Sequence, residues 1–453
     1  MAAINLVQVS EAITHNRFSA EFFDPRYVFA PAVGTEWLPI GRVLKKCEYG
    51  LSISMNSAGQ GFPIFRMNEL DGCFAQRPAK FANISQTEFN SSALRENDVL
   101  FNRTNSFEFV GRTGIVKDQT DCTFASYLIH LVPDATRLLP EFLTIFLNTS
   151  FGIGQIKRRA MRSINQANVS GSEVRKILIH LPGLSLQQEV ANLVNAAFVK
   201  QRDTLSAYVA AQNLLNTALC LDKLIFQKPV GYAAQFSELE SSRRCDADYF
   251  QPMYKQLDAL AANYPNKRIK TISEKLVTGI YSSSYSEKGI PYIRGTDVQS
   301  GYIENMAILK TGALKPTLSS IAKEDDILVT RVGSIGVCGI VEKELAESFF
   351  SDNLIRIRLT TDSKVEISPN YLNLLLNTTY GQMQMLRYSR GSVQQRLNQS
   401  QLAQIPIPII QWQRQQEIEH FLMQHRAAKR ESESLLCRAK TRVEQLIEAA
   451  VQP

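Results

Sequence analysis

The stretch Asp325-Asp-Ile-Leu-Val-Thr-Arg331 decides the fold, because the chain contains a close copy of it, Asn97-Asp-Val-Leu-Phe-Asn-Arg103. The period is near 228 residues, the difference between positions 331 and 103. Further matched blocks occur in the same order: Ala20–Tyr27 with Ala247–Tyr254, Gly61–Arg66 with Gly289–Arg294, Gly114–Val116 with Gly339–Val341, Pro140–Thr149 with Pro369–Thr378, and Leu181–Glu189 with Ile407–Glu417. Solenoid units recur every ~20 to 50 residues, so a period this long indicates two duplicated domains.

Each half of the chain has the same predicted organisation. Short β-rich runs alternate with Gly, Asn and Ser turns and a few helical segments, which is typical of a mixed α/β (α+β) globule. A long segment nearly without Gly or Pro then follows. We therefore predict globular domains over 1–185 and 228–410, each followed by a long helix, over 186–227 and 411–453.

The two long segments carry narrow apolar stripes. In the first, the residues step by 4 and 3 in a heptad pattern: Val194, Phe198, Gln201, Leu205, Tyr208, Gln212, Leu215 and Leu219. The second stripe is looser: Ile418, Phe421, Leu422, Leu435, Leu436, Ala439, Val443, Leu446 and Ile447. About 36 helical residues make a rod of roughly 54 Å. We expect the two rods to pair antiparallel; the alternative is that each rod folds back on its own globule.

Composition indicates an ordinary folded chain. Of 453 residues, 44% are hydrophobic and 21% charged, which leaves room for about three domains of roughly 150 residues. No apolar run approaches the ~20 residues of a membrane helix, and the start of the chain is unlike a secretory signal. Seven scattered cysteines, without a CxxC pair, favour reduced thiols in the cytoplasm over disulfides or a zinc site. The net charge of +7 permits a polyanionic partner.

Catalytic motifs are absent from the sequence. It contains no GxxxxGK[ST] loop, no HExxH pair and no Asn-Pro-Pro-aromatic element of amino-methyltransferases. We therefore expect neither a catalytic residue nor a metal site nor a bound cofactor in this chain.

Basic and amide side chains are the candidate functional residues. Arg103 and Arg331 each follow a strand-like run and precede a polar turn, and a second basic segment follows in each half. Arg, Asn and Gln make bidentate contacts with purine edges, while Lys and Arg also neutralise phosphates. For any single arginine, a surface ion pair remains the alternative. The candidate DNA-binding residues are Arg66, Arg103, Arg112, Lys157, Arg158, Arg159, Arg162, Asn165, Gln166, Arg294, Arg331, Ser334, Arg387, Arg390, Gln394, Gln395 and Arg396.

The chain resembles the specificity subunits of type I restriction–modification systems over nearly its whole length. The motifs that carry the resemblance are Asp326–Gly336, Gly289–Val298 and Pro406–Glu417, all in the second half. The first half departs from the family pattern at Asn105–Phe109 and at Phe65–Asn68.

This resemblance implies two target-recognition domains that read a bipartite, asymmetric target, with paired helices setting the unread spacer. It implies a non-catalytic subunit that directs adenine methylation and restriction by its partners. Those partners would be double-stranded DNA, two modification (methyltransferase) subunits, and restriction/translocase subunits. S-adenosylmethionine, ATP and magnesium would be bound by the partner subunits.

Two alternatives stay open at this point: the recognition part of a fused methyltransferase/restriction enzyme, and a coiled-coil scaffold that does not bind DNA. DNA binding through several phosphates weakens steeply between ~50 and 200 mM salt, whereas an apolar protein interface does not. We further hypothesise that shortening the first long helix by four residues changes the spacer and not the half-sites.

Overall fold

The computed structural model divides into two compact units. Unit 1 comprises Met1–Asp203 with Ala427–Pro453, and unit 2 comprises Thr204–Arg426. The structure describes residues 7–451 except 16–17, 19, 25–26, 28–34, 119–120, 225, 227–228, 305, 311–319 and 391–394. Each unit thus takes one globule and part of both long helices.

Unit 1 is built around a six-stranded sheet. In spatial order its strands are β2 (Leu44–Tyr49), β12 (Leu128–Pro133), β8 (Val99–Asn102), β10 (Thr113–Ile115), β6 (Phe74–Ala75) and β5 (Leu70–Asp71). Smaller sheets join β11 (Thr123–Phe124), β4 (Phe62–Phe65), β7 (Phe81–Ala82) and β3 (Met55–Asn56); β13 (Met161–Arg162), β14 (Ala167–Asn168) and β9 (Thr104–Asn105); and β1 (Trp37–Pro39) with β15 (Leu178–His180). Its shorter helices are α1 (Val9–His15), α2 (Gln86–Ser92), α3 (Pro140–Leu147), α4 (Ser150–Arg159) and α5 (Gly171–Arg175).

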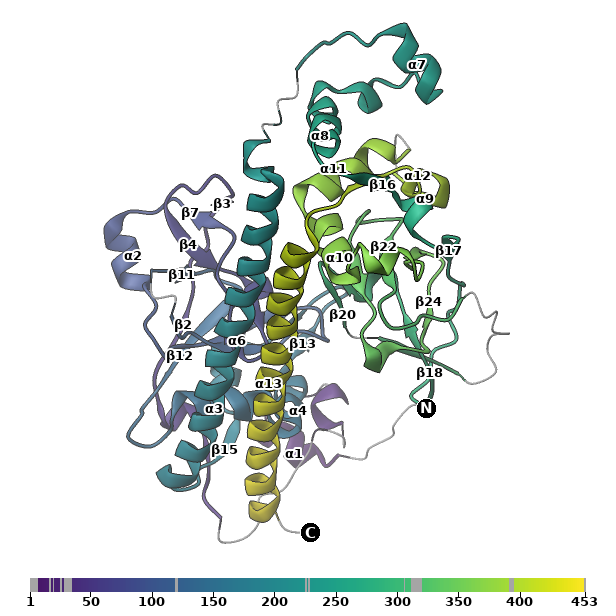
Figure 1. Cartoon of the computed structure of the whole chain (residues 1–453). Coiled ribbons are helices and arrows are strands. Elements are labelled where there is room, and N and C mark those ends of the chain that lie inside the picture. The colour runs from purple at the N-terminus through teal and green to yellow at the C-terminus, as the bar shows by residue number, and fades with distance from the viewer. Residues whose placement is uncertain are drawn as a thin grey trace. The chain divides into compact units, whose positions relative to one another are not determined.

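Unit 2 has a smaller central sheet of four strands, β17 (Val277–Thr278), β25 (Leu354–Ile357), β22 (Ile327–Thr330) and β23 (Cys338–Ile340). Around it lie β21 (Ala307–Lys310), β18 (Gly289–Ile293) and β24 (Phe349–Phe350); β19 (Val298–Gln299) and β20 (Tyr302–Ile303); and β16 (Asn266–Arg268) with β26 (Pro406–Pro408). Its shorter helices are α7 (Phe236–Ser242), α8 (Pro252–Ala262), α9 (Ile269–Ile272), α10 (Pro369–Asn377), α11 (Thr379–Tyr388) and α12 (Gln399–Leu402). The mixed α/β fold class is confirmed (Figure 1).

The duplicated stretch forms the central strand of each unit. All four residues of β8 and all four of β22 are buried, because each strand has neighbours on both sides and cores on both faces. Just before each strand, Asn97 and Asp325 adopt nearly the same left-handed backbone angle, φ 70° and φ 71°. The two copies of the repeated sequence therefore have the same backbone conformation at this point.

The helix pairs that follow also repeat in detail. Thr149 accepts a hydrogen bond from the Gly152 amide at the start of α4, and Thr378 accepts one from the Gly381 amide at the start of α11. A Cβ on Gly152 would lie 2.1 Å from the Phe146 carbonyl oxygen, so no larger residue fits this close helix junction.

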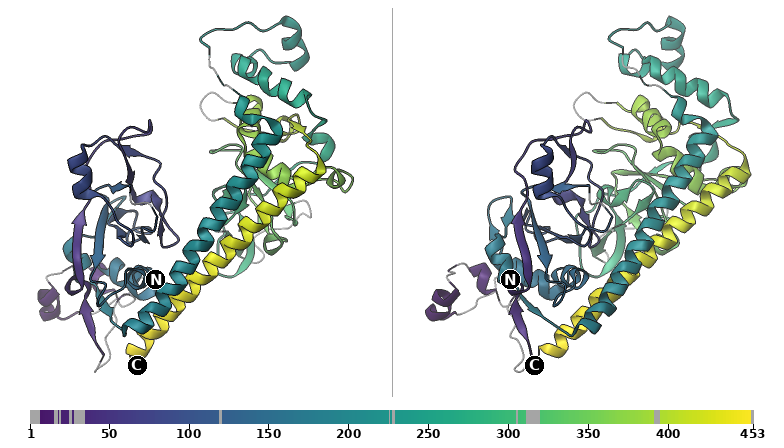
Figure 2. Two further views of the ribbon diagram at one scale, coloured as in Figure 1. Left: turned by 60° about the vertical axis from the view of Figure 1, so that its left-hand side comes forward. Right: turned by 90° about the vertical axis from the view of Figure 1, so that its left-hand side faces the viewer.

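The two long helices are α6 (Leu184–Leu219) and α13 (Trp412–Ala450). They lie side by side and antiparallel within each unit (Figure 2). In unit 1, the Arg442 guanidinium lies 3.0 Å from the Glu189 carboxylate, and the Ser432 hydroxyl donates to the Ala197 carbonyl at 2.9 Å. In unit 2, His425 Nδ1 lies 2.9 Å from the Thr204 carbonyl oxygen. Antiparallel pairing is confirmed, and the alternative in which each helix folds back alone is wrong.

The seam of α6 differs in register from the prediction. Val194, Leu215 and Leu219 are fully buried, and Phe198 and Tyr208 are partly buried, but Leu205 is 65% exposed. The fully buried small residues Ala197 and Ala211 pack in the seam instead. The predicted seam had the larger neighbours Phe198 and Gln212 at these two steps and so missed the alanines. On α13, Leu422 and Val443 are buried and Phe421, Leu435 and Leu446 pack against the cores at their edge.

The ends of the long helices also correct the prediction. The helix predicted over 186–227 begins at Leu184 and ends at Leu219. It ends there because Cys220 turns left-handed, at φ 52°, and Leu221 then packs into the core of unit 2. The second helix ends at Ala450, where the Thr35 hydroxyl donates to the Ala450 carbonyl at 3.0 Å.

The seam assignment predicts a sharp contrast between two leucines of α6. Leu215→Ala should lower the free energy of unfolding by about 2–5 kcal/mol, because the side chain is fully buried. Leu205→Ala should change it by less than about 0.5 kcal/mol, because that side chain is mostly in water. Urea denaturation of the two variants tests this. Equal losses of stability would contradict a seam that buries Leu215 and exposes Leu205.

Candidate nucleic-acid interface

Unit 1 brings its two predicted basic segments together. Arg103 leaves β8, and β9 directly after it pairs with β14, which in turn pairs with β13. The Val169 amide also donates to the Arg103 carbonyl at 2.9 Å. The turn after β8 and the hairpin that carries Arg162 therefore form one continuous surface.

Unit 2 joins the corresponding segments in the same way. Single bridges connect Val332 to Arg396 and Arg396 to Arg390, and the Leu397 amide donates to the Arg331 carbonyl at 3.1 Å. The two basic segments of each half are separate in the sequence, but in each unit they are joined by strand pairing and hydrogen bonds.

The duplicated arginines are anchored alike. Nη1 of Arg103 donates to the Ser126 carbonyl at 3.4 Å, and Nη1 of Arg331 donates to the Asp352 carbonyl at 3.2 Å. Both side chains are half-buried, and among the described residues neither Nε has a hydrogen-bond partner. Each unit therefore holds one Nη1 group by a backbone carbonyl and buries the Nε group of the same guanidinium without a partner among the described residues.

Arg103 has two further contacts that Arg331 lacks in the described part of the chain. Its guanidinium lies 4.6 Å from the centre of the Tyr49 ring, and Nη2 donates to the Asn168 side chain at 3.2 Å. Neither Tyr49 nor Asn168 was predicted as functional. Asn168 had one available signal, its position two residues after Gln166 in the segment already singled out.

Two exposed arginines of unit 1 stack on phenylalanine rings of the same turn. The guanidinium of Arg162 lies 3.4 Å from the centre of the Phe107 ring, and that of Arg112 lies 4.2 Å from the centre of the Phe109 ring. Cation–π stacking fixes the plane of a guanidinium while leaving its N–H edge exposed. These aromatic residues were missed because the sequence reading considered only polar side chains.

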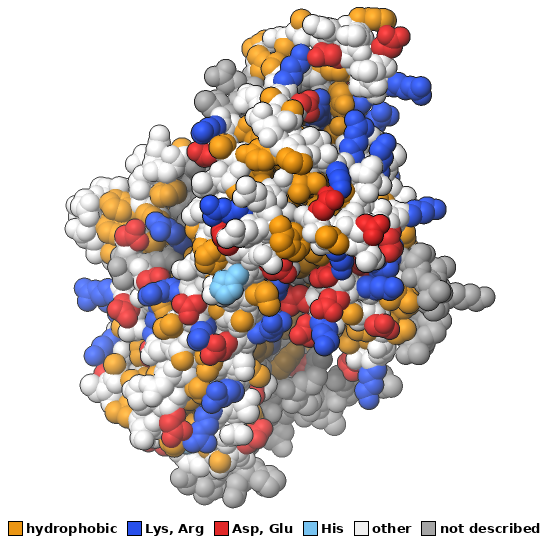
Figure 3. Space-filling model, in the orientation of Figure 1, with side chains coloured by type: hydrophobic (Ala, Val, Ile, Leu, Met, Phe, Trp, Pro, Cys, Tyr) orange, Lys and Arg blue, Asp and Glu red, His pale blue; other side chains and the backbone are white. Residues whose placement is uncertain are grey.

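Most other candidates lie at the surface of their unit. The exposed members are Arg112, Arg162, Asn165, Gln166, Ser334, Arg390, Gln395 and Arg396. Gln394 lies outside the described residues. On the face shown in Figure 3, Lys and Arg side chains are interspersed with Asp and Glu, so the basic excess is not gathered in one patch.

Two candidates, Lys157 and Arg387, are less accessible than the prediction as DNA contacts implies. Lys157 is only 8% exposed, and its ammonium donates to three backbone carbonyls of unit 1. The Arg387 side chain is 11% exposed, because its guanidinium pairs with Asp258 at 2.7 Å and stacks on Tyr249. Both charged groups are thus engaged by groups of their own unit.

Neighbouring arginines of α4 are also engaged within unit 1. Arg158 Nε donates to the Phe22 carbonyl at 2.8 Å, and Arg159 Nη2 donates to the Lys176 carbonyl at 3.1 Å. Both side chains are half-buried. Their contacts are those of residues that attach the end of a helix to its surroundings.

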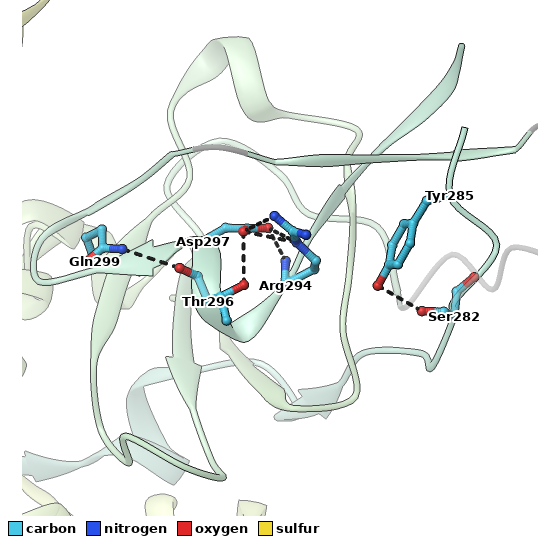
Figure 4. Close-up of polar contacts among 6 residues, drawn as sticks. All are labelled: Ser282, Tyr285, Arg294, Thr296, Asp297 and Gln299. Carbon is cyan, nitrogen blue, oxygen red and sulfur yellow. Dashed lines mark hydrogen bonds and ion pairs between the residues drawn. The ribbon is translucent and has the colours of Figure 1, made fainter. Parts of the chain in front are cut away.

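Arg66 and Arg294 occupy equivalent positions and make equivalent ion pairs. Arg294 Nη2 lies 2.7 Å from the Asp297 carboxylate, which is buried, and its backbone amide donates to the same group at 2.8 Å (Figure 4). Arg66 pairs with Glu69 in the same way. The pairing with Asp297 raises the pKa of Arg294 further. On the open side, the Arg294 guanidinium lies 6.0 Å from the centre of the Tyr285 ring.

Neither a metal cluster nor a membrane helix occurs in the described part of the chain. Within it, no group of three or more His, Cys, Asp and Glu side chains is placed to hold a metal ion. No helix among the described residues is both long and apolar enough to cross a membrane.

Comparison with known proteins gives a consistent set of relatives. Residues 263–435 match the family model described as the type I restriction modification DNA specificity domain. The specificity subunit of the type I restriction enzyme EcoKI from Escherichia coli (strain K12) is 30% identical over 162 residues, 34% of this chain and 34% of that protein. A putative type I restriction enzyme MjaX specificity subunit from Methanocaldococcus jannaschii is 23% identical over 156 residues, 34% of this chain and 37% of that protein. The match thus spans about a third of each curated relative.

Solved structures resemble the chain over most of its length at low identity. The S subunit of a type I restriction–modification system from M. genitalium is 13% identical, with a TM-score of 0.44, over 93% of this chain and 98% of that one. The HsdS subunit from Thermoanaerobacter tengcongensis is 15% identical, with a TM-score of 0.29, over 92% of this chain and 97% of that one.

Proposed function

We propose that this chain, whose residues 263–435 belong to the type I restriction modification DNA specificity domain family, is the sequence-specific DNA-recognition subunit of a type I restriction–modification complex. The observation that carries the proposal is the duplicated site. In each unit an arginine whose Nη1 donates to a backbone carbonyl stands beside a second basic segment, on one continuous surface. Arginine side chains suit guanine edges, and neighbouring basic side chains suit phosphates.

In this function each unit reads one half-site. The turns after Arg103 and Arg331 differ in length and composition, so the two half-sites differ in sequence and the target is asymmetric. The antiparallel pair of α6 and α13 sets the length of the unread spacer. A helix of 36 residues spans roughly 54 Å, more than the ~34–36 Å of one DNA turn.

The chemistry belongs to partner subunits in this proposal. The chain would bind double-stranded DNA and two modification subunits that use S-adenosylmethionine to methylate adenine, and restriction subunits that use ATP and magnesium. The chain itself would be a non-catalytic cytoplasmic subunit. The lack of catalytic motifs in the sequence is in keeping with that role.

Methylome sequencing tests the proposal. The full chain is expressed in a host with its modification subunit, and the host carrying the modification subunit alone is the control. We expect a bipartite methyladenine motif only when the chain is present. Identical methylomes in the two hosts would contradict the proposal.

The salt dependence of DNA binding is the second test. For the assembled complex, the association constant should fall steeply between ~50 and 200 mM salt, because each neutralised phosphate releases a counterion. An affinity that does not change with salt would favour a protein-binding scaffold.

A further inference from the structure

The turn of unit 1 between β9 and β10 leaves three backbone carbonyls without a backbone donor among the described residues. Within it, the Phe109 and Val110 amides donate to the Ser106 carbonyl, at 3.1 and 2.9 Å, and the Arg112 amide donates to the Phe109 carbonyl. The carbonyls of Phe107, Glu108 and Val110 remain. A buried carbonyl without a donor destabilises a fold by about 1–3 kcal/mol.

One side chain satisfies all three carbonyls. The Lys157 ammonium donates to the carbonyl of Phe107, to that of Glu108 at 2.9 Å and to that of Val110 at 3.0 Å. Those three bonds use the full donor capacity of an ammonium group. The ammonium also lies 5.0 Å from the centre of the Phe107 ring, on which Arg162 stacks. Lys157 therefore connects the turn to α4, and Arg162 connects the same turn to the hairpin beside it.

The turn is also packed closely against α4, the helix that carries Lys157. Gly111 closes the turn at φ 94°, and a Cβ there would lie 2.5 Å from Ile156 Cγ2. Any side chain at this position would push the turn off the helix. The Lys157 ammonium and the close approach of Gly111 together hold the turn against α4.

We propose that Lys157 is a positioning residue that holds the turn 106–110 in the shape with which unit 1 reads DNA, and that Lys157 itself makes no DNA contact. This inference rests on the proposed function. The turn exposes Glu108 and Phe109, and Arg112 directly after it is exposed too, so this segment presents a carboxylate, an aromatic ring and a guanidinium. A carboxylate accepts from cytosine N4, and an aromatic ring contacts the thymine methyl group.

Unit 2 offers an internal comparison. Its turn after Arg331 is closed by the Gly336 amide, which donates to the Thr330 carbonyl at 2.8 Å, and by Gln382, which donates to the Gly336 carbonyl at 2.8 Å. The residue that corresponds to Lys157 is Leu386, which is 41% exposed. The lysine clamp, meaning Lys157 with its three carbonyl acceptors, thus serves the first half-site alone.

The charge state of the lysine clamp sets the conditions of the test. Burial lowers the pKa of Lys157 to about 8, with Arg162 and Arg112 lowering it too, and Glu108 opposing them. The three carbonyl acceptors favour the ammonium as well. At about pH 7, which is below this pKa, Lys157 is mainly in its ammonium form, so the measurements are made at that pH.

Lys157→Met, which keeps the length of the side chain and removes its donors, separates positioning from phosphate binding. In the assembled complex, we expect it to lower discrimination at the first half-site at least about fivefold, and to leave the second half-site unchanged. The slope of the logarithm of the DNA association constant against the logarithm of the salt concentration should be the same as in the unmodified chain. A phosphate contact would instead lower that slope by about 1. Arg162→Met, at an exposed arginine, serves as the comparison in which the slope should fall, and Lys45→Met serves as a neutral control.

Amide hydrogen exchange, measured on the full chain without DNA, tests the role of Lys157 independently of DNA binding. In Lys157→Met, the amides of 106–112 should exchange at least about tenfold faster, while those of β8 and β12 stay protected. Unchanged exchange in the turn would overturn the inference, as would a slope lowered by about 1. Faster exchange in a chain that binds no DNA would leave the lysine clamp in place and overturn the proposed function instead.

Discussion

Replacing Arg331 by alanine should weaken recognition of the second half-site by roughly 5- to 150-fold, because one well-made bidentate base contact contributes about 1–3 kcal/mol. Among the described residues, the guanidinium is attached to unit 2 through a single carbonyl, that of Asp352. Its removal should therefore leave the fold intact and the first half-site unaffected. Methylome sequencing of the variant should show a motif that has relaxed at one position of one half, or methylation that is lost altogether.

Arg103→Ala is the matched experiment in unit 1, and its effect should fall on the other half-site. Arg331→Lys separates the two possible contacts: a lysine still neutralises a phosphate but lacks the planar fork that reads guanine. Loss of base preference in Arg331→Lys with most of the affinity kept indicates base reading. If Arg331→Ala methylates the same motif to the same extent, Arg331 has only a structural role.

Removing one heptad from both long helices should shorten the spacer by about three base pairs. Seven residues correspond to roughly 10.5 Å of helix, and B-DNA rises ~3.4 Å per base pair. The segments to delete are 196–202 of α6 and 427–433 of α13. Their removal eliminates the Lys200–Glu431 and Ser432–Ala197 contacts as complete pairs. Seven residues keep the heptad phase of the seam, whereas a deletion of four would turn it by about 40°.

The methylome of this double deletion should contain both original half-sites at the shorter spacing. The extent of methylation should fall, because three base pairs also rotate one half-site by nearly a third of a DNA turn. The matched control is the deletion of 196–202 alone, which leaves the paired helices unequal and should lower stability without giving a new motif; because the helices are paired, this expectation replaces the hypothesis that shortening the first helix alone changes the spacer. An unchanged spacer in the double deletion would show that the helices do not set the distance.

The sequence predicts the architecture well where the pattern is local. The repeated central strands and the two long helices follow from short motifs and from a spacing of 3 and 4 residues. The register of α6 does not: the pattern selects Phe198 and Gln212 over the small buried residues Ala197 and Ala211, and it includes Leu205, which is exposed. Which residue of a heptad faces the partner depends on the partner's surface, which no single segment encodes.

The candidate site shows the same division. Arg103 and Arg331 can be found from the repeat, but their union with the second basic segment depends on strand pairing across more than 60 residues. The burial of Lys157 was not predictable from its neighbours either. In the sequence Lys157-Arg-Arg159 is simply basic, and only the backbone of a distant turn gives the lysine its three acceptors.

The sharing of the helices has a consequence for biosynthesis. The core of unit 1 includes Leu436, Ala439, Val443 and Ile447, more than 230 residues beyond the rest of its globule. Unit 2, by contrast, consists of one continuous stretch, 204–426. On the ribosome, most of unit 1 is therefore translated before unit 2, but its last segment, 427–453, is translated after unit 2. Until the second half of α13 has been translated, the core of unit 1 lacks these four residues, and the apolar surface that they cover is open to chaperones or to aggregation.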